Sequence, residues 1–181
     1  MQLADRLLGS LPAEVAAEGL VIGVPRGGIM VAAAVAQRLG RPLLSWCARK
    51  LASEVSPEYA IGAIAPGGVQ LLHADEARRL GMEGATLQRV IDRESAELER
   101  RRLRYGDPPP NVLRQRHLLL VDDGLATGLT IEAIVQSLGQ LSPASLRLAV
   151  PVADDTTIER LRPLVDDLLV LRRVRRLRSV G

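Results

Sequence analysis

The sequence has few cysteines, lysines and aromatic residues, and these scarcities exclude several classes of function. Cys47 is the sole cysteine, so the chain can form neither an internal disulfide nor a thiolate metal cluster, and we expect a buried structural thiol. Aromatic residues make up 2% of the 181 residues, which leaves little surface for stacking nucleic-acid bases. No apolar run approaches the roughly 18 residues of a membrane span, so we expect a cytoplasmic protein without a membrane segment.

The net charge of +3 does not describe a basic domain surface. Five arginines lie within 172–178, and removing them changes the net charge to −2. The basicity therefore belongs to an expected tail at 172–181, and a nucleic-acid partner is disfavoured.

Lysine occurs once, at Lys50, among 24 basic residues. Elsewhere the chain uses arginine, whose planar guanidinium does not reproduce the compact ammonium of lysine. Lys50 thus either marks a site where the chemistry requires an ammonium or survives by chance, and composition alone leaves both open.

Apolar runs alternate with helical patterns along most of the chain. The expected strands are 20–24, 43–48, 117–121, 146–150 and 167–171. Helical spacing appears at 29–39 and 131–141, and a capping-box pattern at 156–159 predicts a last short helix. We therefore predict one α/β domain, 1–181, with a doubly wound, mainly parallel five-stranded sheet in the order 2-1-3-4-5 flanked by helices.

An insertion at 51–115 separates the second and third core strands. Its first part, 51–68, contains Pro57, Gly62, Pro66 and Gly67 and is typical of a loop. A charged helix follows at 85–104, and its i,i+4 charge pairs are those of a solvated face. We expect a loop and a helix here, with the loop available as a lid.

The segment 121–130, VDDGLATGLT, combines a strand end, a glycine-containing turn and a helix N-terminus. Exposed N–H groups, the helix dipole and close backbone approach together favour anion binding, to which Thr127 and Thr130 add hydroxyl donors. Two carboxylates beside a phosphate would repel it unless they bind a neighbouring group. The hydroxyls of a ribose need hydrogen-bond acceptors, and Asp122 and Asp123 fit that role. The alternative is that both are turn-forming aspartates. A Walker loop and a haloacid-dehalogenase site lack their required motifs here.

A second anion loop follows the first strand at Val24-Pro25-Arg26-Gly27-Gly28. Here an arginine replaces the carboxylates, which suits a pyrophosphate, although an ordinary glycine-rich turn is the alternative. In the predicted strand order the sheet reverses between the strands that precede these two loops, and ligands bind at such switch points. We therefore expect both loops to face one crevice.

The segment 121–130 resembles the signature of type I phosphoribosyltransferases, which binds 5-phosphoribosyl 1-pyrophosphate (PRPP). Together with the Arg-Gly-Gly loop, Arg49-Lys50 and the segment 57–63, PEYAIGA, it is similar across nearly the whole chain to a group of uncharacterised bacterial predicted phosphoribosyltransferases. Members of that group usually begin earlier and extend beyond a Val-Gly such as Val180-Gly181, so both ends look shortened.

The resemblance implies a role for each matching residue. Asp122 and Asp123 would hold the ribose hydroxyls, and Gly124, Leu125, Ala126, Thr127, Gly128 and Thr130 the 5-phosphate. Arg26, Gly27, Gly28 and Lys50 would hold the pyrophosphate. Arg49, Glu58 and Tyr59 would belong to a lid that excludes water.

Mg²⁺ is the expected cofactor, bound through PRPP with few protein ligands, and Asp122 or Asp123 is expected to reach it through water. The two histidines, His73 and His117, lack metal-ligand spacing, and we interpret both as structural.

The implied activity is transfer of the phosphoribosyl group to a nitrogenous base or amine with release of pyrophosphate. A non-catalytic PRPP-binding regulator of nucleotide metabolism is the alternative, and the arginines at 172–178 could serve its partner. The sequence does not identify the acceptor, the catalytic base or the oligomeric state, and a homodimer is expected from the resemblance alone.

Overall fold

The main sheet of the protein is parallel and five-stranded in this computed structural model, which describes residues 2–53, 60–175 and 177. Its strands follow the order β2-β1-β6-β7-β8. They are β1 (Leu20–Gly23), β2 (Leu43–Ser45), β6 (His117–Val121), β7 (Ser145–Asp154) and β8 (Asp167–Val174). This is the predicted order 2-1-3-4-5, so the predicted fold class is confirmed.

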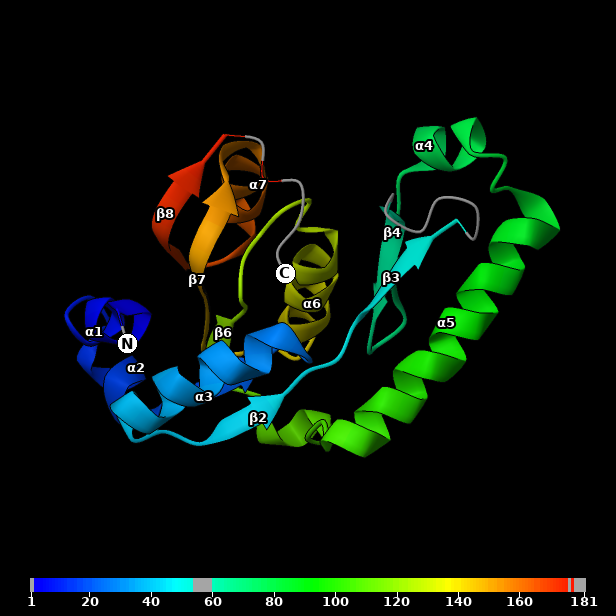
Figure 1. Cartoon of the computed structure of the whole chain (residues 1–181). Helices are drawn as coiled ribbons and strands as arrows, with labels where there is room; N and C mark the ends of the chain where they lie inside the picture. The colour runs from blue at the N-terminus through cyan, green and yellow to red at the C-terminus, as the bar shows by residue number, and fades with distance from the viewer. Residues whose placement is uncertain (1, 54–59, 176, 178–181) are drawn as a thin grey trace.

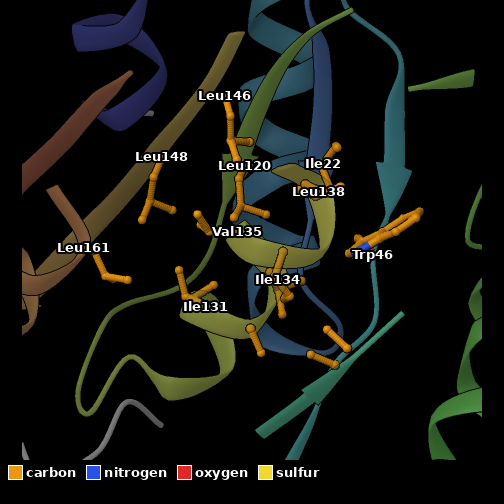
Figure 2. Close-up of a cluster of buried hydrophobic side chains, with 14 of the residues drawn as sticks. Ile22, Trp46, Leu120, Ile131, Ile134, Val135, Leu138, Leu146, Leu148 and Leu161 are labelled. Carbon is orange, nitrogen blue, oxygen red and sulfur yellow. The ribbon is translucent and has the colours of Figure 1, made fainter. Parts of the chain in front are cut away.

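Helices cover both faces of this sheet. Successive residues of β6 point to opposite sides: Leu119 and Val121 pack in one cluster with α1 (Gln2–Leu8) and α3 (Gly27–Leu39). Leu118 and Leu120 pack in the other, with α6 (Leu129–Gly139) and α7 (Asp155–Leu161), and Figure 2 shows the α6 side of this core. Because both faces are covered, the central strands β1 and β6 are continuous apolar runs apart from His117 at the start of β6.

A second, antiparallel sheet stands between α6 and α5 (Gly84–Tyr105), as Figure 1 shows. Its strands are β3 (Arg49–Ala52), β4 (Ala60–Ala65) and β5 (Val69–Leu72), in the order β3-β4-β5. Ala63 and Ala65 join the main core beside α6, whereas Leu51 and Ile64 pack with α5 and α4 (Ala74–Arg79). The insertion therefore has a core of its own on one face and shares the main core on the other.

Two buried polar networks fasten the insertion to the main sheet. Trp46 Nε1 donates to Ser137 Oγ of α6 at 3.1 Å, and that hydroxyl donates to the Pro66 carbonyl at 2.5 Å. Asp107, just after α5, accepts hydrogen bonds from Ser45 Oγ at 2.7 Å and Cys47 N–H at 2.8 Å. The passage from β2 to β3 is thereby held at both α6 and α5.

Cys47 is buried, as predicted. Burial and the neighbouring Asp107 carboxylate raise the pKa of the Cys47 thiol far above its ordinary value. The thiol is therefore protonated and unreactive at neutral pH.

The prediction of a loop at 51–68 is wrong, because much of this segment is strand. The second core strand ends at Ser45, and Arg49 and Lys50 begin β3 instead of ending β2. Pro66 and Gly67 lie in the turn between β4 and β5, whereas Gly62 lies inside β4. A Cβ at Gly62 would lie 2.1 Å from the Leu71 carbonyl oxygen, so this glycine permits close strand pairing.

The prediction of a helix at 85–104 is confirmed by α5, in which Glu97 binds Arg101 at 2.7 Å. The capping box was misplaced by two residues: α7 begins at Asp155, and Asp154 Oδ1 accepts from the Thr156 N–H at 2.9 Å. The short helices α1, α2 (Ala13–Glu18) and α4 were not predicted, nor were the 3-10 turns Pro110–Val112 and Arg162–Leu164.

The expected basic tail begins inside the sheet. Arg172 and Arg173 belong to β8, and Arg173 binds Asp155 at 2.8 Å and Glu159 at 3.3 Å. Arg176 and Arg178 lie outside the described residues. Among the described residues, no helix is both long enough and apolar enough to cross a membrane.

Candidate phosphate-binding site

The segment predicted as the first anion loop lies between β6 and α6. It runs from Asp122 to Gly128, and Gly128 adopts a left-handed conformation with φ of 68° immediately before the helix. The first bond of α6 joins the Glu132 N–H to the Gly128 carbonyl at 2.9 Å, so the preceding N–H groups of the first turn have no intrahelical acceptor. These N–H groups and the helix dipole favour an anion.

Side chains of α7 donate hydrogen bonds to backbone carbonyls of this loop. Thr157 Oγ1 donates to the Ala126 carbonyl at 2.5 Å, and the Arg160 guanidinium donates to the Thr127 carbonyl. Arg160 also pairs with Glu132 of α6 at 3.1 Å. The supports come from far along the chain, and no spacing in the sequence indicates them.

Leu125 is placed differently from the other residues predicted to bind the 5-phosphate. Its side chain is buried in the main core. Its N–H donates to the Val152 carbonyl and its carbonyl accepts from the Asp154 N–H, both at 2.9 Å. Leu125 thus anchors the loop, while Thr127 is exposed and Thr130 half-buried.

The second anion loop lies directly against the first. Val24 N–H donates to the Val121 carbonyl at 3.3 Å. A Cβ added at Gly27 would lie 1.8 Å from Asp123 Oδ2, and one added at Gly28 would lie 2.3 Å from Asp122 Oδ1. A side chain at either position would therefore displace the facing carboxylate.

The chemistry of this junction follows from what the two loops bring together. Arg26 is exposed beside Gly27, and the peptide bond between Pro25 and Arg26 is cis. The predicted meeting of the two loops at the switch point of the sheet is thus observed, with a cation and two carboxylates close to the N-termini of α3 and α6. Such a set can hold a ligand that carries both phosphate and hydroxyl groups.

The two aspartates are electrostatically linked. Burial, followed by repulsion from the neighbouring Asp123 charge, raises the pKa of Asp122 well above the ordinary range of a carboxyl. The pair therefore retains a proton under conditions in which two isolated aspartates would both be ionised. Ligand hydroxyl groups that donate hydrogen bonds to the two carboxyls would stabilise the negative charge that appears when this proton leaves.

Arg49 and Lys50, although adjacent, have different surroundings. Arg49 Nη2 binds Glu94 Oε2 of α5 at 2.6 Å, so its guanidinium belongs to the α5 side of the second sheet. Lys50 is exposed on the next position of β3. The sequence offered no sign that Glu94, on a helix interpreted as a solvated face, would be buried.

The predicted lid is not a loop over its described part. Ala60 to Ala63 form the first residues of β4, and Ile61 and Ala63 are fully buried. Glu58 and Tyr59, assigned to the same lid, lie outside the described residues. Within 2–53, 60–175 and 177, no group of three or more His, Cys, Asp or Glu side chains could hold a metal ion.

A doubly wound α/β sheet with two contacting glycine-containing loops at its switch point is an arrangement that suits a phosphorylated ligand. The chain belongs to the family of the phosphoribosyl transferase domain, whose model matches residues 3–170. The family resemblance drawn from the sequence is therefore confirmed, and phosphoribosyl transfer is the general chemistry of this family.

Several known proteins are similar to the chain. "Putative phosphoribosyl transferase Rv0571c" of Mycobacterium tuberculosis is 35% identical over 94% of the chain. The match spans 38% of the length of that relative. Bifunctional protein PyrR of Ralstonia nicotianae is 29% identical over 93% of the chain and 85% of its own length.

Solved structures show the same fold. The crystal structure of TT1426 from Thermus thermophilus has a TM-score of 0.68 and 32% identity, covering 99% of this chain and 84% of that one. The purine phosphoribosyltransferase from Pyrococcus horikoshii has a TM-score of 0.50 and 16% identity, covering 97% and 85%, and supports the fold alone.

Proposed function

We propose that the chain binds PRPP and transfers its phosphoribosyl group to a nitrogenous base or amine, with release of pyrophosphate. The observation that supports this most directly is the contact of Gly27 and Gly28 with Asp123 and Asp122. It joins an arginine-bearing anion loop, two carboxylates and a helix N-terminus in one place. PRPP carries a 5-phosphate, two free ribose hydroxyls and a pyrophosphate, which is the set of groups that these elements suit.

Each element is assigned one part of PRPP. Asp122 and Asp123 accept hydrogen bonds from the ribose hydroxyls. The loop from Gly124 to Gly128, with Thr130, surrounds the 5-phosphate through N–H and hydroxyl donors, and Leu125 anchors it. Arg26, Lys50 and the backbone of Gly27 and Gly28 bind the pyrophosphate.

The reaction is a displacement at ribose C1 with inversion. The nitrogen lone pair forms the new bond to C1 as the bond from C1 to the pyrophosphate oxygen breaks, and the nitrogen then loses its proton to solvent water. Negative charge accumulates on the leaving pyrophosphate, and Arg26 and Lys50 are cations assigned to stabilise it. The loops position the sugar for attack and the aspartates fix its orientation.

Mg²⁺ fits this arrangement as an ion that arrives with PRPP. Hard carboxylate oxygens from Asp122 and Asp123 are suitable ligands, directly or through water, and most of the coordination would come from PRPP oxygens and water. Bound there, the ion would neutralise part of the pyrophosphate charge.

Calorimetric titration of PRPP with Mg²⁺ tests the assignment. Wild type should bind, and the D122N/D123N double variant should bind at least about a hundredfold more weakly, because two charge-assisted hydrogen bonds to the ribose are lost. Asp92→Asn, an exposed carboxylate on α5 that accepts from Gln88, is the matched control and should leave binding unchanged. Equal binding by wild type and the double variant would contradict the proposed site.

The alternative is a non-catalytic PRPP-binding regulator of nucleotide metabolism. The relative named Bifunctional protein PyrR indicates that a chain of this family can carry more than one function. A panel of bases and amines separates the two: an enzyme releases pyrophosphate from bound PRPP with at least one acceptor, and a regulator binds PRPP without release.

We also propose a cytoplasmic location and a homodimer, with no nucleic-acid partner.

A further inference from the structure

Arg49 and Lys50 are adjacent cations on β3, and the structure places them on opposite faces of the second sheet. Arg49 pairs across the strands with Ile64, and Lys50 pairs with Ala63. Ile64 packs in the cluster that contains α5, whereas Ala63 packs in the main core beside α6. Directly opposed residues of an antiparallel pair share a face, so Arg49 is on the α5 face and Lys50 on the α6 face.

The α6 face is the side of the proposed PRPP site. The first anion loop leads directly into the N-terminus of α6, and β4 packs against this helix. Figure 1 shows the second sheet beside α6, with α5 on its far side. A cation held on the α6 face is therefore on the ligand side of β3, and one on the α5 face is not.

A buried carboxylate on α5 distinguishes the two cations. Glu94 is 8% exposed, and its Oε2 accepts from both Arg49 Nε at 2.8 Å and Arg49 Nη2 at 2.6 Å. Its Oε1 accepts from Arg93 Nε at 3.2 Å. A buried carboxylate without a cation is strongly destabilised, and the two converging donors of a guanidinium cannot be reproduced by one ammonium.

β3 lies at the edge of the second sheet, and the Arg49–Glu94 pair adds to the hold that the buried Leu51 has on its register. Among the described strands β3 pairs with β4 alone, at the edge of the sheet, and its register is irregular between Leu51 and Ala52. A slip by one residue would exchange the faces of Arg49 and Lys50. We propose that Glu94 is a positioning residue: by binding Arg49 it holds Lys50 on the α6 face, where the ammonium contacts the pyrophosphate of PRPP.

This inference rests on the proposed function, and three ligands test it separately from that function. PRPP and inorganic pyrophosphate, each with Mg²⁺, carry the group assigned to Lys50, whereas ribose 5-phosphate does not. Calorimetry is done on wild type, Lys50→Met, Glu94→Gln and the K50M/E94Q double variant. Glu97→Gln is the matched control, because Glu97 lies on the same helix and binds Arg100 and Arg101 instead of β3.

We expect Lys50→Met and Glu94→Gln each to weaken PRPP and pyrophosphate about tenfold, the loss of roughly one charge-assisted contact. Ribose 5-phosphate binding should stay within about twofold, and the double variant should bind like Lys50→Met, because both changes remove the same contact. Glu97→Gln should match wild type. If Glu94→Gln does not fold, Glu94→Asp keeps the charge and should show a smaller loss confined to the same two ligands.

Uniform weakening of all three ligands by the Glu94 variants, no weakening, or losses that multiply in the double variant would each overturn the positioning role. Normal PRPP binding by Lys50→Met would overturn it while leaving the proposed function in place. If wild type binds neither PRPP nor ribose 5-phosphate, the proposed function is itself wrong and the inference is lost with it.

Discussion

At the residue scale, the glycines of the second anion loop are defined by what they touch. Gly27 and Gly28 do not serve a left-handed turn; they leave room for the carboxylates of Asp123 and Asp122. The sequence indicated a glycine-rich anion loop here. It could not show that the space beside the glycines is filled by residues from a different strand.

A methyl group at Gly27 should therefore disturb the site without unfolding the chain. Gly27→Ala places a Cβ 1.8 Å from Asp123 Oδ2, and we expect PRPP affinity to fall at least about tenfold because that carboxylate must move. Titration calorimetry measures the loss.

Gly40→Ala is the matched control. Gly40 ends α3 with φ of 64° and has open space around its Cβ position, so its substitution should cost about 1 kcal/mol of unfolding free energy and leave PRPP affinity unchanged. If Gly27→Ala behaved like Gly40→Ala, the contact between the loops would not matter for binding.

The raised pKa of Asp122 makes the stability of the ligand-free chain depend on pH. The folded chain keeps a proton that the unfolded chain releases, at pH values above the ordinary carboxyl pKa and below the raised one. Because the folded state then binds more protons, the free energy of unfolding falls as the pH rises through this window.

Asp122→Asn removes this dependence, because the amide does not ionise. Urea unfolding at about pH 5 and about pH 8 should show a smaller decrease for the variant than for wild type, by an amount on the order of 1 kcal/mol. Identical pH slopes for the two proteins would show that Asp122 is not the buried group responsible.

At the element scale, prediction succeeded where a segment showed helical spacing or a continuous apolar run, and it failed where glycine and proline interrupted the apolar pattern. α5 and the core strands were recognised because 3.6-residue spacing or continuous apolar runs identify them. β3 and β4 were missed because glycine and proline in 51–68 are also typical of loops. These strands are stabilised by packing between α6 and α5, and that packing has no local signal.

At the scale of the whole molecule, the second sheet and the main sheet share one core. Ala63 and Ala65 of β4 pack in the same cluster as Leu120 of β6. Trp46, the sole tryptophan, lies where the chain passes from one sheet to the other and bonds to α6. Because unfolding of either sheet would expose the cluster that both sheets share, we expect one cooperative unfolding transition.

Two probes check this expectation in urea. Trp46 fluorescence reports the junction of the sheets and far-ultraviolet circular dichroism reports all elements, and their midpoints should coincide. PRPP with Mg²⁺ should move both midpoints equally upward, since it binds the folded state. Two separated transitions would show instead that the second sheet unfolds as an independent domain.

The sequence by itself determined the family, the parallel sheet and the two anion loops, because each depends on residues close together in the chain: apolar runs, helical spacing, and the Asp-Asp and Gly-Gly motifs. Only the tertiary structure decided which groups meet. In the structure Gly27 lies against Asp123, and Leu125 anchors the first anion loop to β7. Arg49 pairs with Glu94, whereas Lys50 lies on the α6 face of β3. These outcomes depend on packing between distant segments and on which strand face is covered, and no local pattern encodes either one.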